Sequence, residues 1–119
     1  MLSAFAGDQP AGGAIVAVEP EDHWFFLPEP GQAVLWDLRV APAYRAQRVG
    51  RRLMREAAAA DLEAGCHRLA IETQDVNVAA CRLYASAGAV LSEVRSGAYR
   101  EHPDEAALLW FMDLNPAAP

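Results

Sequence analysis

The sequence predicts a single α/β domain, of the α+β kind, whose strands and helices follow the order β-β-β-α-β-α-β-β. Its 119 residues, 53% of them hydrophobic, are enough for one core and too few for two. The spacing of apolar residues changes twice from alternation to the helical period. The stretch from Ala33 to Thr73 reads as strand, helix and strand, which implies two parallel strands joined by a right-handed crossover.

The chain is expected to begin with a hairpin. Leu2 to Ala6 is short and apolar, and Gly7-Asp8-Gln9-Pro10 has the composition of a turn. Gly13 to Val18 then reads as the second strand. Prolines and a glycine make Glu19 to Gln32 an irregular excursion, whose aromatic residues at positions 24–26 are expected to cover the sheet edge.

Ala33 to Val40 is the first strongly predicted strand. Alternation puts Asp37 and Arg39 on one face. The opposite face is expected to carry Val34, Trp36, Leu38 and Val40. Pro42 ends the strand, because proline lacks the donor that a β-ladder needs.

Two helices alternate with the remaining strands. From Gly50 the apolar period is helical, and Gly65 supplies a C-terminal stop. The inward stripe of this helix is expected to be Val49, Leu53, Ala57, Ala60 and Ala64. Asn77 is a good N-cap for a second helix, which Gly88 closes. The other expected strands are Arg68 to Thr73, Ala89 to Tyr99 and Ala106 to Leu114.

Positive charge is concentrated in one part of an acidic chain. The formal net charge is −6, and all ten Lys and Arg positions are arginine. Five of them lie within one short stretch: Arg45, Arg48, Arg51, Arg52 and Arg55. Cations at a helix N-terminus are locally unfavourable, but a bound phosphate would reverse the sign of that effect. With Gly50 at the helix start, the stretch has the strand–turn–helix geometry of a phosphate cradle, the alternative being an arginine-rich solvated face.

Composition argues against several other classes of protein. The negative net charge argues against a nucleic-acid partner. No apolar run approaches the ~18 residues needed to cross a bilayer, and the first residues do not have the pattern of a signal peptide, so a cytoplasmic protein is expected. Cys66 and Cys81 fall inside predicted elements and are expected to be reduced thiols. The three histidines are scattered, and no metal is expected.

The segment from Val40 to Leu53 resembles the acyl-CoA loop of the GNAT superfamily of N-acetyltransferases. The pattern of that loop is Arg/Gln-x-x-Gly-x-Gly/Ala, and here Arg45 and Gly50 match its first and last places. Arg48 stands in place of the middle glycine, and Ala46 in place of a common glycine after the leading arginine.

A second block is similar to the late strand and helix of GNAT enzymes: Glu72-Thr73-Gln74-x-x-Asn77-x-x-Ala80-Cys81-x-Leu83-Tyr84-Ala85-x-x-Gly88. Ala89 departs from the phenylalanine usual in the family. The Glu-Thr-Gln motif most resembles the sequences of streptothricin acetyltransferases, as do Tyr99 and the motif Glu105-x-Ala107-x-x-Trp110. The resemblance covers roughly Gly13 to Leu114.

The resemblance implies a GNAT-like, mixed and mostly antiparallel sheet around the central parallel β-α-β unit, in one acyl-CoA-binding domain over residues 1–119. It also implies that the usual first strand and two helices, which form one wall of the acceptor cleft, are lacking. Either the second subunit of a homodimer supplies that wall, or apolar sheet surface and an open acceptor site remain.

The resemblance also implies roles for the matching residues, with acetyl-CoA as the co-substrate. Tyr84 corresponds to the general acid and contacts the cofactor, while Asn77 caps its helix and touches the pantetheine arm. The diphosphate would be held along Arg45, Ala46, Gln47, Arg48, Val49, Gly50, Arg51 and Arg52. The strand segment whose bulge aims an N–H at the thioester carbonyl maps to Leu38, Arg39 and Val40.

Two carboxylates are candidates for the base. Asp37 and Glu72 lie on adjacent parallel strands, where either could take the amine proton through water or hold a cationic substrate. The alternative is a carboxylate paired with Arg39 or Arg68.

The leading interpretation is therefore acetyl transfer to a primary amine of a small molecule, such as an antibiotic. The main alternative is a shortened, non-catalytic module that binds CoA or acyl-CoA. A third is a generic α/β domain that binds another phosphorylated ligand.

Overall fold

The computed structural model describes residues 2–6, 9–20, 25–41 and 48–114 of the chain. The elements follow the predicted order: β1 (Leu2–Ala6), β2 (Gln9–Val18), β3 (Gln32–Val40), α1 (Val49–Glu63), β4 (Arg68–Gln74), α2 (Val78–Ser86), β5 (Val90–Ser96) and β6 (Ala106–Asp113).

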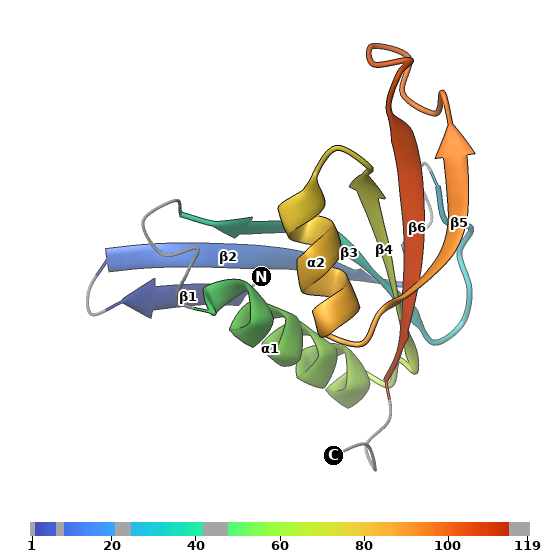
Figure 1. The fold of residues 1–119 in the computed structure, drawn as a ribbon. Helices are drawn as coiled ribbons and strands as arrows, with labels where there is room; N and C mark the ends of the chain where they lie inside the picture. Colours follow the sequence, from blue (N-terminus) through green and yellow to red (C-terminus); the bar gives the residue numbers. More distant parts are fainter. Residues whose placement is uncertain (1, 7–8, 21–24, 42–47, 115–119) are drawn as a thin grey trace.

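The strands of the described residues form one sheet in the order β1-β2-β3-β4-β6-β5. Only β3 and β4 are parallel, and α1 is the crossover between them, as Figure 1 shows. All other neighbouring strands are antiparallel. The predicted mixed, mostly antiparallel sheet is confirmed.

The first hairpin is tighter than predicted. Gln9 and Pro10 belong to β2 rather than to a turn, since they pair with Ala6 and Phe5. The register shifts beside this pair, between Ala4 and Phe5. A proline is tolerated here because a bulge interrupts the ladder where a donor would be needed. Residues 7 and 8 lie outside the described residues.

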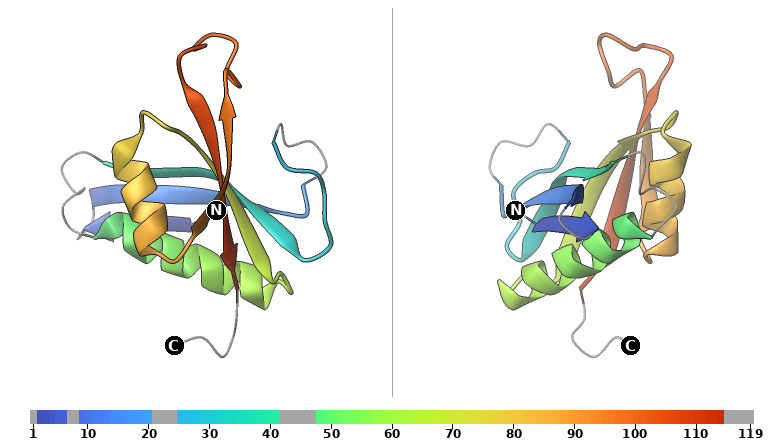
Figure 2. Two further views of the ribbon diagram at one scale, coloured as in Figure 1. Left: turned by 45° about the vertical axis from the view of Figure 1, so that its right-hand side comes forward. Right: turned by 90° about the vertical axis from the view of Figure 1, so that its left-hand side faces the viewer.

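Both helices cover the same face of the sheet, as the two views of Figure 2 show. The main core lies between them and the strands, and its largest fully buried members include Leu53, Met54, Leu69 and Ile71. Tyr84 of α2 and Trp110 of β6 belong to the same core.

The other face carries a smaller cluster. Phe26 packs there with Val34, Ala70 and Leu109, and Phe25 and Phe111 adjoin them. Phe26 meets Phe111 edge-on, with ring centroids 5.6 Å apart. The prediction that these aromatic residues cover the sheet edge is wrong for Phe26, because its partners come from the central strands β3, β4 and β6. Phe25 does lie at the edge strand β5, where Arg95 is over its ring, and Trp24 lies outside the described residues.

The predicted face of β3 also needs correction. Ile15 of β2 pairs with Asp37 while Val16 pairs with Leu35, so Trp36 is an extra residue in β3. A β-bulge of this kind reverses the alternation beyond it. Leu35 and Leu38 consequently both face the helices, whereas Val34 lies in the cluster on the opposite face.

The buried stripe of α1 is not the one predicted. Leu53 and Ala57 are buried as expected, but Ala64 is exposed and the last buried position is Asp61. Asp61 is 1% exposed, and its Oδ2 has no hydrogen-bond partner in the described part of the chain. Burial raises the pKa of this carboxyl to about 6.

Candidate functional site

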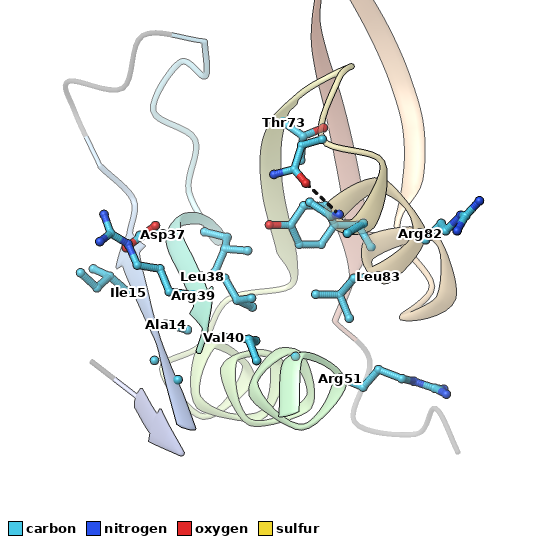
Figure 3. A pocket seen from close by; sticks show the side chains of 18 of the residues that line it. Ala14, Ile15, Asp37, Leu38, Arg39, Val40, Arg51, Thr73, Arg82 and Leu83 are labelled. Carbon is cyan, nitrogen blue, oxygen red and sulfur yellow. Dashed lines mark hydrogen bonds and ion pairs between the residues drawn. The ribbon is translucent and has the colours of Figure 1, made fainter. Parts of the chain in front are cut away.

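A cleft opens where β3 and β4 separate. The two strands pair only from Gln32–Arg68 to Leu35–Ile71, and the bulge at Trp36 follows at once. Beyond that point the strands form the two walls of a cleft of about 1250 Å³. The first turn of α1 and one side of α2 complete it (Figure 3).

The β3 wall contains the strand segment singled out from the sequence. Leu38, Arg39 and Val40 all line the cleft, opposite Ala14, Gly13 and Gly12 in the pairing with β2. The bulge itself lies earlier, at Trp36, which also lines the cleft. A bulged residue leaves the regular ladder, so the backbone irregularity is at the point where the strands begin to diverge.

The start of α1 is not capped by a side chain. Arg48 occupies the N-cap position in the left-handed region, with φ of 59°, and its side chain makes no capping bond. The first turn contains no acidic residue. Its unpaired N–H groups and partial positive charge therefore suit an anion.

Close packing joins this helix start to α2. A Cβ at Gly50 would lie 3.0 Å from Leu83 Cδ2, so the glycine allows the two helices to approach. The neighbours of this contact, Arg51 and Arg82, both line the cleft, and in Figure 3 they extend from the two helices toward the same side of the view.

Of the predicted phosphate-loop residues, the structure brings Arg48, Gly50 and Arg51 to the cleft. Val49 packs against the core instead, and Arg52 forms an ion pair with Glu56 at 3.2 Å without lining the cleft. The predicted contacts of Arg45, Ala46 and Gln47 lie outside the described residues.

The start of α2 is capped as predicted. The Ala80 N–H donates to Asn77 Oδ1 at 3.2 Å, and Asn77 lies on the cleft. The capping role is confirmed, and contact with a cofactor remains a prediction.

Tyr84 lies on the inner side of α2. It is 6% exposed, lines the cleft and meets Trp110 edge-on, with centroids 6.4 Å apart. Burial, followed by the charges of Asp37, Cys81 and Glu72, raises its pKa to about 12. The phenol is therefore protonated at neutral pH and can donate a proton.

Asp37 and Glu72 lie on opposite walls of the cleft. Asp37 pairs with Arg39 at 2.9 Å, as one reading of the sequence suggested. Glu72 does not pair with Arg68, which instead bonds to Gln32 and Glu29. Glu72 accepts a hydrogen bond from Tyr99.

Several lining residues were not identified from the sequence, among them Arg82, Thr73 and Ser86. Arg82 was missed because it lies on α2, far in sequence from the arginine-rich stretch at the start of α1. Within the described residues, none of Arg48, Arg51 and Arg82 forms an ion pair. As far as the described residues go, the cleft therefore has three arginines without an ion pair at its helix side.

Three further observations concern metal ligands, membrane spans and cysteines. In the described ranges, no three His, Cys, Asp or Glu side chains gather in a way that could hold a metal ion, and no helix is long and apolar enough to span a membrane. Cys66 and Cys81 are both free thiols.

Comparison with known proteins agrees with this architecture. The acetyltransferase (GNAT) family model matches residues 1–89. Streptothricin acetyltransferase A of Bacillus subtilis (strain 168) is 34% identical over 83 residues, which are 68% of this chain and 48% of that protein. The chain thus spans about half the length of this relative.

Two solved structures share the fold. One is a Bacillus anthracis (strain Ames) protein described as a streptothricin acetyltransferase, in complex with acetyl coenzyme A; it has 27% identity and a TM-score of 0.77 over 92% of this chain and 59% of its own. The other is nourseothricin acetyltransferase, with 28% identity and a TM-score of 0.79 over 95% of this chain and 64% of its own.

Proposed function

This chain belongs to the GNAT family of acetyltransferases, and on that premise we propose that it transfers the acetyl group of acetyl-CoA to a primary amine of a small molecule. The observation that supports this most is the cleft between the diverging strands β3 and β4. Its lining includes a protonated, buried phenol, two carboxylates and three arginines without ion pairs among the described residues.

The helix side of the cleft suits the phosphates of acetyl-CoA. The uncapped start of α1 offers backbone N–H groups, and Arg48, Arg51 and Arg82 offer charge-assisted hydrogen bonds. We assign the diphosphate to the start of α1 together with the preceding residues Arg45, Ala46 and Gln47. Leu38, Arg39, Val40 and Asn77 would flank the pantetheine arm.

The strand side suits acyl transfer. Acetyl-CoA supplies an activated thioester. A carboxylate of the cleft takes one proton from the acceptor's ammonium group, and the amine nitrogen then bonds to the thioester carbon. As the carbon–sulfur bond breaks, its electron pair goes to sulfur, which receives the phenolic proton of Tyr84. The new amide nitrogen releases its second proton, which returns to Tyr84 through water.

After burial, which is the largest cause, the charges of Asp37 and Glu72 also raise the pKa of Tyr84, so they would couple this proton transfer to acceptor binding. A cationic acceptor between Asp37 and Glu72 offsets their negative charge. The phenol then becomes a stronger acid at the stage when it must protonate the thiolate.

The acceptor we propose is a cationic small molecule, and streptothricin is the first to test. Relatives of this chain are described as streptothricin and nourseothricin acetyltransferases. The acidic balance of the chain, with a net charge of −6, also favours a cationic substrate.

The substitution Tyr84→Phe tests the catalytic part of the proposal. Removal of the phenolic proton should lower kcat for streptothricin about 10²–10⁴-fold, the usual contribution of general acid catalysis. The dissociation constant of CoA, measured by calorimetry, should stay the same, because the ring and its packing on Trp110 remain.

The outcomes distinguish the competing functions. Micromolar CoA binding by the unaltered protein with no acetylation of streptothricin or other amines would favour the non-catalytic CoA-binding module. Binding of other nucleotides as tightly as CoA would favour a general phosphate-ligand domain. A homodimer and a cytoplasmic location remain part of the proposal, and sedimentation velocity and cell fractionation measure them.

A further inference from the structure

The two carboxylates of the cleft have different partners. Asp37 is paired with the guanidinium of Arg39, at 2.9 Å between Oδ2 and Nε, so it already has a cationic partner within the chain. Glu72 forms no ion pair in the described part of the chain and has a neutral partner, the hydroxyl of Tyr99. A hydrogen bond from a neutral group orients a carboxylate and leaves its negative charge in place.

Tyr99 reaches Glu72 from a distant part of the sheet. It lies between β5 and β6, and its hydroxyl donates to Glu72 Oε2 and lies 3.3 Å from the carbonyl oxygen of Thr73. Its ring meets Phe25 edge-on, with centroids 6.0 Å apart. Burial, together with the contact to Glu72, raises the pKa of Tyr99, so the hydroxyl remains a donor throughout the physiological pH range.

The segment that carries Tyr99 is tied to the end of β4. The Asp75 N–H donates to the carbonyl oxygen of Ala106 at 2.9 Å, and the Ala106 N–H donates to Asp75 Oδ1 at 3.0 Å. This reciprocal pair joins the start of β6 to the turn that follows Glu72, Thr73 and Gln74. Tyr99 is therefore held in register with the β4 wall of the cleft.

We propose that Glu72, rather than Asp37, receives the ammonium group of the acceptor, and that Tyr99 is a positioning residue that holds Glu72 for this task. With Oε2 bonded to Tyr99, the second oxygen of Glu72 is available to accept the acceptor's proton. This inference rests on the proposed acetyl transfer and deepens it. It also resolves which of two carboxylates is the base, a choice that sequence leaves open.

The experiment is a double-mutant cycle with Tyr99→Phe and Glu72→Gln, using streptothricin and acetyl-CoA as substrates. Tyr99→Phe removes only the hydroxyl and keeps the ring on Phe25. It should lower kcat/KM for streptothricin about 10-fold or more, since a misplaced catalytic group costs up to ~10² in rate. The KM for acetyl-CoA should not change, because Tyr99 does not line the cofactor cleft.

Energetic coupling between the Tyr99 and Glu72 substitutions is the readout that a merely structural role of Tyr99 would not produce. In the Glu72→Gln background, Tyr99→Phe should have an effect of less than about 2-fold, because there is no carboxylate left to position. Asp37→Asn should lower kcat/KM for streptothricin less than Glu72→Gln does. An absorbance titration of the phenols in the same variants should show the Tyr99 transition moving to lower pH when Glu72 becomes glutamine.

His102→Gln is the matched control. It removes the contact between His102 Nδ1 and Glu105 Oε2, at 3.3 Å, in the same β5–β6 connection and should leave kcat/KM unchanged. Two results would overturn the inference while leaving the proposed function intact. One is that Tyr99→Phe lowers kcat/KM by the same factor in the Glu72→Gln and wild-type backgrounds, and the other is that Tyr99→Phe leaves kcat/KM unchanged. If the unaltered protein acetylates no amine, the proposed function fails first, and the inference with it.

Discussion

The two helices border one cleft, but they begin in opposite ways. At α2 the Asn77 side chain accepts a hydrogen bond from the N–H of Ala80, so this helix start is capped within the chain. At α1 the N-cap is Arg48 in a left-handed conformation without a side-chain bond, and the first turn carries arginines instead of carboxylates. The start of α2 is thus stabilised by its own side chain, and the start of α1 fits our proposal that a bound anion stabilises it.

The helices also differ in what they bury. α2 buries Tyr84, which packs on Trp110 and belongs to the proposed chemistry. α1 buries Asp61, whose Oδ2 has no partner among the described residues, and nothing in the structure explains this carboxylate. Substitutions at the start and at the buried end of α1 should therefore change its stability in other ways than substitutions in α2, whose start is capped.

The largest expected effect concerns Asp61. The pKa of its carboxyl is raised from 3.8 to about 6 in the folded state, so the folded protein binds more protons than the unfolded chain between these values. The resulting stabilisation is complete below about pH 4 and is lost as the pH rises through 6, by about 3 kcal/mol in total.

Asp61→Asn should abolish this pH dependence. Urea unfolding of both proteins from pH 4 to 8 should give a difference in unfolding free energy that changes by about 3 kcal/mol across the range, in favour of the variant at high pH. Parallel pH profiles for the two proteins would mean that the carboxylate finds a partner in solution.

The next effect separates binding from stability at the start of α1. Arg51→Glu places a negative charge in the first turn, which should raise the unfolding free energy by about 0.3–1 kcal/mol. The same change should weaken CoA binding about 100-fold, because a charge-assisted bond is replaced by repulsion. Calorimetric titration with CoA and thermal unfolding measure the two quantities.

Arg55→Glu is the matched control for this charge reversal. Arg55 is also exposed on α1, one turn later, and does not line the cleft. It should change neither quantity appreciably. Equal weakening of CoA binding by both substitutions would indicate a general electrostatic effect and remove the special role of the helix start.

The contrast between the helices also shows what sequence could predict. The element order, the Asn77 cap and the parallel unit were predictable because each depends on local spacing or on one capping residue. The sequence motif of α2 likewise predicted a site position for Tyr84, which lines the cleft, and its catalytic role is part of our proposal. These features need no knowledge of which distant residues meet.

The remaining features depend on pairing between distant segments. The bulge at Trp36 arises from the register between β2 and β3, and the Tyr99–Glu72 contact joins residues 27 apart in sequence. Arg82 of α2 lines the same cleft as Arg48 and Arg51, on helices that approach each other where Gly50 meets Leu83. Burial of Asp61 is a further case, since a helical period alone predicts an apolar residue on that face.

The smallest expected effect tests the comparison directly at the two caps. Asn77→Ala removes the acceptor for the Ala80 N–H and should lower the unfolding free energy by about 1 kcal/mol. For a domain of this size, that corresponds to a decrease in Tm of roughly 4 °C. Arg48→Ala removes no capping bond and should change the Tm by much less, while weakening CoA binding. If Arg48→Ala lowered the Tm as much as Asn77→Ala, α1 would have a cap of its own, and its start would no longer be distinguished as a place for an anion.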